Sequence, residues 1–136
     1  ERERLEQKQQ SLTHPERIDF LGFLENYEDV LGQMRAADVF ASPSIREGFG
    51  ITFVEAMAAD CTVIAASHPE SAADEVLGEA GFLVDPTVNS IATRLGAVLG
   101  GEQPSTNPTE RAQRYDWDTV ADQAETVYKR AIEGTW

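Results

Sequence analysis

The feature that most constrains this fold is a short apolar run, TVIAAS at 62–67, in which polar residues do not alternate with apolar ones. Strands buried on both faces have this pattern, and they occur in parallel sheets covered by helices. Further strands are predicted at 17–24, 39–43 and 81–86, with helical segments between them. This alternation predicts an α/β fold, a Rossmann-like parallel sheet of about four strands flanked by helices.

The helical segments have their own boundary signals. Gly78 is suited to end one helix, and Asn107 is suited to begin another with Pro108 at its first position. The predicted helices cover residues 1–10, 27–38, 51–59, 70–78, 88–99, a short stretch from 108, and 118–133. In the last of these we expect partial burial of Val120, Ala124, Val127 and Ile132.

The net charge of the chain limits the kinds of partner that we expect it to bind. The chain has 24 acidic residues against 11 Lys and Arg, which gives a net charge of −13. No basic patch is evident that would neutralise phosphates, so we do not expect nucleic acid as a partner. A carboxylate-rich surface suits a protein adapted to high salt, and the alternative is an ordinary acidic domain. The lone Cys61 is expected to be a small core residue.

Length and hydropathy define the expected organisation. The 136 residues fit a single domain over 1–136. No run of about 18 apolar residues occurs, so no membrane-spanning segment is predicted and the expected location is the cytoplasm. The first residue is Glu1 and not Met, which we interpret as a sign that the chain is a piece of a longer protein. Regions outside the chain could then associate with a membrane.

The stretch REGFGITFVE at 46–55 is the candidate functional motif. Gly48 and Gly50 permit a tight turn and a close approach of a ligand to the backbone. The helix that follows presents unpaired amides and the positive end of its dipole, which suits a phosphate. Glu47 and Glu55 lie on the two sides of this turn and could accept hydrogen bonds from sugar hydroxyls.

A phosphate between two sugars describes a nucleotide sugar, and we take that as the candidate ligand. The alternative is coincidence, because two glutamates with seven residues between them are unremarkable among 24 acidic residues. A Gly-Phe-Gly turn is also a weak signal when it stands alone.

Residues 37–67, ADVFASPSIREGFGITFVEAMAADCTVIAAS, resemble the central signature of glycosyltransferase family 4, which comprises retaining enzymes of the GT-B type. The shared pattern is a strand ending in Pro-Ser, then Glu-Gly-Phe-Gly, a second Glu after seven intervening residues, and a hydrophobic strand. Segments 17–24, 74–86 and 114–128 are similar to flanking parts of the family's domain. The resemblance implies the C-terminal half of a GT-B architecture, which binds the nucleotide-sugar donor.

The resemblance implies roles for individual residues. Glu47 is the candidate catalytic residue and would contact the donor-sugar hydroxyls, and Glu55 would bind the ribose. The amides of Phe49, Gly50 and Ile51 would face the sugar and the diphosphate, with Gly48 completing the turn. Gly22, Phe23 and Leu24 would lie near the base. For Arg46 we keep two alternatives, contact with the phosphates or a pair with a surface acid.

The resemblance also implies what the reaction requires. Family members transfer a sugar with retention, commonly without a metal ion, and need no cofactor beyond the nucleotide-diphosphate sugar itself. Their acceptors are lipids, proteins or glycans, and the sequence does not distinguish these. We assign no metal site, no nucleophile and no general base.

Three departures from the family pattern affect the expectations. Asp60 stands where the family has Gly, so Asp60 is expected in a left-handed turn. The loop SHPESAADEV at 67–76 differs from the family's Gly-Gly and Pro-Glu-Val pattern: Glu75 keeps the acid, and Asp74 replaces the proline. The family's opening strands, with their Gly-Arg and Lys-Gly segments, and its acceptor domain are expected before Glu1.

The third departure leaves the strand at 17–21 two places from the strand at 39–43 in a sheet of order 3-2-1-4-5-6. Three outcomes are open: this strand pairs elsewhere, it exchanges with another copy, or the chain comes from a longer protein. Unpaired strand edges also give the chain a route to self-association.

Three functions are kept at this point. The leading one is the donor-binding part of a glycosyltransferase, inactive as an isolated chain. The second is a nucleotide-sugar epimerase on the same architecture, and the third is a non-catalytic binding module that keeps the fold.

Overall fold

A parallel sheet of three strands forms the centre of the protein, in a computed structural model that describes residues 1–135. The strands are β1 (Val39–Ser42), β2 (Thr62–Ala66) and β3 (Gly81–Val84), in the order β1-β2-β3. Phe40 pairs with Val63, and Ile64 pairs with Phe82. Every residue of the central β2 is buried, as its uninterrupted apolar sequence predicts.

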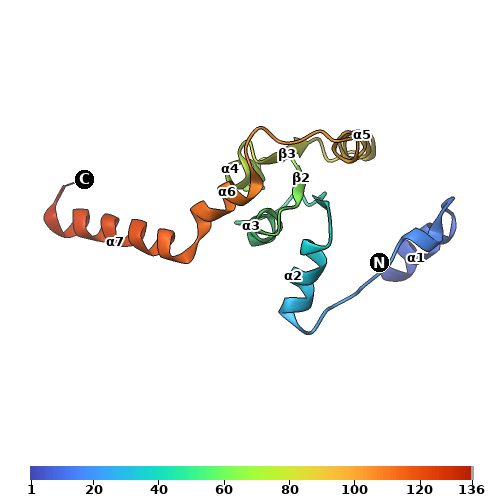
Figure 1. Ribbon diagram of the computed structural model, residues 1–136, viewed down its shortest axis with the longest axis horizontal. Helices are drawn as coiled ribbons and strands as arrows, with labels where there is room; N and C mark the ends of the chain where they lie inside the picture. The colour runs from blue at the N-terminus through green and yellow to red at the C-terminus, as the bar shows by residue number, and fades with distance from the viewer. Residues whose placement is uncertain (136) are drawn as a thin grey trace.

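Helices cover both faces of the sheet (Figure 1). On β2, Val63 and Ala65 point into a core that α2, α3, α4 and α6 share, while Ile64 points into a second core with Val84 and Val98 on the α5 side. The helices are α1 (Arg2–Gln10), α2 (Tyr27–Arg35), α3 (Ile51–Ala58), α4 (Ala73–Leu77), α5 (Val88–Leu99), α6 (Pro108–Ala112) and α7 (Trp117–Glu133), with short 3-10 turns at Pro15–Arg17 and Gln113–Tyr115. None of the helices within residues 1–135 is long and apolar enough to cross a bilayer.

Several local predictions are confirmed. The side chain of Asn107 accepts a hydrogen bond from the Glu110 amide at 3.1 Å and caps α6, and Gly78 ends α4 with a positive φ of 52°. Asp60 has a φ of 66° and occupies the left-handed turn after α3, where the Thr109 hydroxyl donates to its carboxylate at 3.3 Å. Cys61 is buried, and its thiol donates to the carbonyl of Met34 at 3.0 Å.

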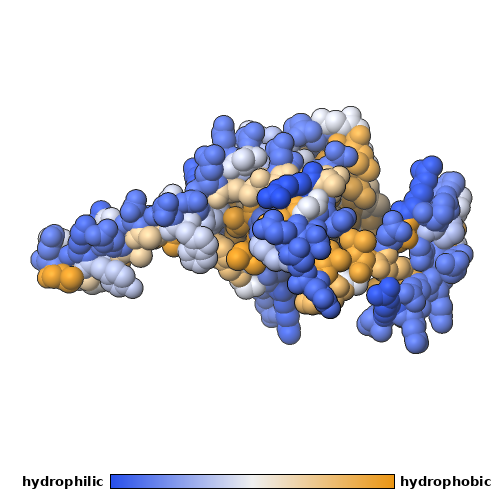
Figure 2. Space-filling view, turned by 60° about the horizontal axis from the view of Figure 1, so that its bottom comes forward, coloured by the Kyte–Doolittle hydropathy of each residue, from blue (hydrophilic) through white to orange (hydrophobic). Residues whose placement is uncertain are grey.

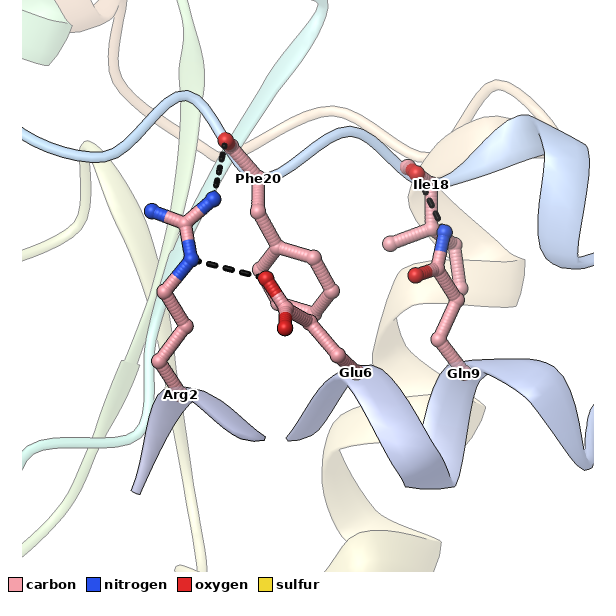
Figure 3. Close-up of polar contacts among 5 residues, drawn as sticks. All are labelled: Arg2, Glu6, Gln9, Ile18 and Phe20. Atoms are coloured by element: carbon pink, nitrogen blue, oxygen red, sulfur yellow. Dashed lines mark hydrogen bonds and ion pairs between the residues drawn. The ribbon is translucent and has the colours of Figure 1, made fainter. Parts of the chain in front are cut away.

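The strand predicted at 17–24 is absent from the described residues, and the sheet therefore has three strands instead of four. A strand needs a neighbouring strand to form hydrogen bonds with its backbone groups. Here side chains of α1 form hydrogen bonds with some of these groups instead. Gln9 Nε2 donates to the Pro15 carbonyl at 2.7 Å. Figure 3 shows its second bond, to the Ile18 carbonyl at 2.6 Å, and the bond from Arg2 to the Phe20 carbonyl at 3.4 Å beside the Arg2–Glu6 pair.

Within the described residues this segment pairs with no strand of the sheet. Residues 17–21 do not pair beside β1, whose partner strand in the described part of the chain is β2. After the 3-10 turn that ends at Arg17 the segment has no regular secondary structure, and the alternation of its apolar residues does not make it a strand.

The burial predicted for α7 is wrong. Figure 1 shows this helix projecting away from the sheet, and Figure 2 shows uncovered apolar atoms at its far end. All four residues expected to be partly buried are exposed, and Ile132 keeps 86% of its surface. Trp117 and Tyr128 are exposed too. An amphipathic sequence predicts an apolar face, but it does not say that another element of the same chain will cover that face.

We expect the core around α4 to contribute strongly to stability. Leu77 is fully buried, so Leu77→Ala should lower the free energy of unfolding by about 2–5 kcal/mol through lost burial and the remaining cavity. Leu99→Ala is the matched control, because Leu99 on α5 is 66% exposed and its truncation should change stability by less than about 0.5 kcal/mol. Urea unfolding followed by circular dichroism measures both, and equal losses in the two variants would contradict the placement of this core.

Candidate functional site

The candidate site lies where the chain leaves β1, turns through residues 43–50 and enters α3. Parallel sheets bind ligands beyond the carboxyl ends of their strands, and this turn lies at that edge. Gly50 is the residue before α3, with a φ of 78°, and its carbonyl accepts the amide of Phe53 at 2.9 Å. A Cβ at Gly50 would lie 2.5 Å from a ring carbon of Phe53, so the turn requires glycine both for its φ and for space.

The first amides of α3 have no capping side chain in the described part of the chain. Such amides carry partial positive charge, which the helix dipole reinforces. The side chains around them are open to solvent, since Phe49, Ile51 and Thr52 are all exposed. Gly50 itself is buried.

Glu47 is fixed by its backbone. Its amide donates to the Glu70 carbonyl at 3.3 Å and its carbonyl accepts the Ala72 amide at 3.0 Å, which makes a parallel bridge to Ser71. Its side chain, which is half-buried, passes beside Gly50, with its Cγ 3.2 Å from where a Cβ of that glycine would lie. The structure therefore places Glu47 next to the start of α3, as the sequence predicts.

Glu55 lies on α3 about one turn after its start and is half-buried. Its carboxylate accepts a hydrogen bond from the hydroxyl of Tyr27, the first residue of α2. This hydrogen bond is the main cause of a raised Tyr27 pKa, and desolvation and the negative charges of Glu55 and Glu28 raise it further. The two glutamates thus lie on either side of the start of α3: Glu47 precedes the helix, and Glu55 lies within it.

Tyr27 is a site residue that the sequence analysis missed. It lies 28 positions from Glu55, and no local pattern links a tyrosine at the start of one helix with a glutamate in the next. Knowing how α2 packs against α3 is what would have identified the pair.

Two groups of predicted site residues lie to the side of the turn. Arg46 pairs with Glu70 at 2.7 Å and is largely exposed, so of its two alternatives the structure has the pair with a surface acid. Gly22, Phe23 and Leu24 line an apolar groove with Met34 and Phe40 on the α2 side, and Phe23 keeps 90% of its surface exposed. Gly22 adopts a positive φ of 72° there.

Aromatic packing also holds the turn in place, through Phe49. The ring of Phe49 meets Tyr115 edge-on, with centroids 5.5 Å apart. Arg111 in turn donates to the Val76 carbonyl at 2.9 Å and to the Tyr115 hydroxyl at 3.3 Å. The exposed turn is therefore tied to the end of α4 and to the chain that follows α6.

The two glycines of the turn should respond differently to substitution. Gly50→Ala should lower the free energy of unfolding by roughly 2–4 kcal/mol, because alanine is strained at this φ and its Cβ would collide with Phe53. Gly48→Ala is the control, since Gly48 lacks a positive φ and a Cβ there meets no described atom within 4 Å. Thermal unfolding compares the two, and equal destabilisation would contradict the described turn.

Comparisons with known proteins identify the family of this chain. The family described as Glycosyl transferases group 1 matches residues 1–115. A phosphatidyl-myo-inositol mannosyltransferase of Mycobacterium leprae is 40% identical over 123 residues, which is 84% of this chain and 32% of that protein. The chain spans about a third of the length of the curated relatives it matches.

Solved structures share the fold. A sucrose-phosphate synthase from Thermosynechococcus elongatus superposes with a TM-score of 0.79 and 28% identity, over 98% of this chain and 35% of that one. The C-terminal domain of a glycosyl transferase group 1 family protein from Francisella tularensis gives a TM-score of 0.65 and 31% identity, over 90% of this chain and 62% of that one. By its sequence and by its fold, which is that of the C-terminal α/β domain of GT-B proteins, this chain belongs to the group 1 glycosyl transferases.

Proposed function

We propose that this chain is the donor-binding part of a hexosyltransferase, which transfers a sugar from a nucleotide-diphosphate donor to an acceptor with retention. The observation that carries the proposal is the pair of carboxylates around an uncapped helix start: Glu47 before Gly50 and Glu55 one turn after it. The mannosyltransferase named among the relatives supports mannose as the sugar.

In this proposal each part of the turn has a separate task. Glu47 accepts hydrogen bonds from hydroxyls of the donor sugar, and its position depends on backbone bonds to residues 70–72. The amides at Phe49, Gly50 and Ile51 face the diphosphate, on which negative charge grows as the sugar departs. Because these backbone N–H groups are already oriented toward the diphosphate, they stabilise that charge without reorganising during the reaction.

Glu55 binds the ribose hydroxyls in this proposal. One helical turn separates it from the start of α3, about 6 Å along the axis, which suits a ribose joined to a phosphate at the helix start. The carboxylate would repel the phosphate itself, and its distance from the helix start keeps the two negative groups apart.

The acceptor site belongs, in this proposal, to the part of the longer relatives that this chain does not match. The chain binds a nucleotide sugar, and the acceptor is a lipid, a protein or a glycan. The isolated chain then binds donor without transferring sugar.

Nucleotide binding tests the proposal directly. Calorimetry with GDP and UDP should detect binding by at least one of them, and Glu55→Gln should weaken it by about 10- to 100-fold, because hydrogen bonds to charged groups are worth about 1.5–3 kcal/mol. Glu79→Gln, which changes an exposed carboxylate before β3, is the control and should bind as the parent does. No binding of either nucleotide by the parent would favour a non-catalytic module and overturn the proposal.

We also propose that the acidic surface is suited to salt. At a net charge of −13 the folded chain repels itself, and raising KCl from about 0.1 to 1 M shortens the screening length from about 10 to 3 Å. The midpoint of urea unfolding should therefore rise across this range. A midpoint that stays constant or falls would identify an ordinary acidic domain.

A further inference from the structure

The contact between Tyr27 and Glu55 joins two helices at the candidate ribose site. Tyr27 begins α2, and the side chain of Asn26 caps that helix by accepting the Glu28 amide at 3.3 Å. Tyr27 keeps 55% of its surface exposed, so water can reach this residue. Its hydroxyl donates to Oε1 of Glu55 on α3.

This hydrogen bond restrains a side chain that otherwise turns freely. A glutamate has three rotatable side-chain bonds, and ordering it on binding a ligand costs conformational entropy. A carboxylate has two oxygens and several lone pairs, so a bond to Oε1 leaves Oε2 able to accept another hydroxyl. A Glu55 side chain that is already restrained loses less conformational entropy when the ligand binds, and this improves the affinity.

We propose that Tyr27 is a positioning residue for the nucleoside: its hydroxyl orients the Glu55 carboxylate so that the other oxygen accepts a ribose hydroxyl. The inference rests on the proposed function, since it presumes that Glu55 binds ribose. It assigns to α2 a part in distinguishing ribonucleotides from deoxyribonucleotides.

The contact itself is testable without any ligand. The raised pKa of the Tyr27 phenol depends chiefly on its bond to Glu55, with Glu28 as the other nearby acid. The absorbance change near 295 nm on alkaline titration, taken as the difference between the parent and Tyr27→Phe, isolates this phenol. Glu55→Gln should shift its titration to lower pH, and an unchanged titration would contradict the contact.

Ribose discrimination tests the function of the contact. With the nucleoside diphosphate that the parent binds, Tyr27→Phe should weaken the ribonucleotide by about three- to tenfold, as expected for loss of one supporting hydrogen bond. The 2′-deoxy or 3′-deoxy analogue, whichever the parent binds more weakly than the ribonucleotide, should bind the variant and the parent alike. The ratio of the two affinities should therefore fall. Tyr128→Phe on α7, another exposed tyrosine, is the control and should leave the ratio unchanged.

The outcomes separate the two proposals. A purely structural role for Tyr27 would weaken both nucleotides equally and keep the ratio, and that result would overturn this inference while leaving the proposed function intact. A parent that binds ribonucleotide and both deoxy analogues equally would also overturn it. A parent that binds neither GDP nor UDP would overturn the proposed function and this inference with it.

Discussion

The burial of β2 between two apolar layers is the constraint on which the rest of the structure depends. Val63 and Ala65 face the core of α2, α3, α4 and α6, while Ile64 faces the core on the α5 side. A strand covered on both faces fixes its neighbours in parallel, because the helices that cover it must also serve as the connections between strands. The turn at 43–50 and the loop at 67–72 therefore leave the sheet at the same edge, where they meet through Glu47 and Ser71.

The core of the fold could be predicted from the sequence. The uninterrupted apolar run at 62–66 identifies a central parallel strand, and the glycines at 48 and 50 identify the turn before α3. These features are local: each follows from the residue types at a few neighbouring positions. The left-handed conformation of Asp60 was expected from the glycine that the resembled family has at this position, and not from a local pattern.

Other features could not be predicted because they depend on contacts with segments that are distant in the sequence. The alternating pattern at 17–24 is typical of a strand, but a strand forms only where another backbone lies beside it. The apolar face of α7 is equally clear in the sequence, yet nothing local states what should cover it. The hydrogen bond from Tyr27 to Glu55 requires two helices to pack in one particular way, which neither segment specifies alone.

The bridge between Glu47 and Ser71 has a consequence for variation in this part of the molecule. Its hydrogen bonds are made by main-chain groups of residues 70 and 72, so the chemistry of the side chains there is not what locates Glu47. Apart from Glu70, which pairs with Arg46, and His68 and Ser71, whose side chains accept main-chain amides, the loop from 67 to 71 can accordingly change its composition without displacing the carboxylate beside it. Its length and the presence of an N–H at position 72 are fixed instead, since an insertion or a proline there removes the anchor.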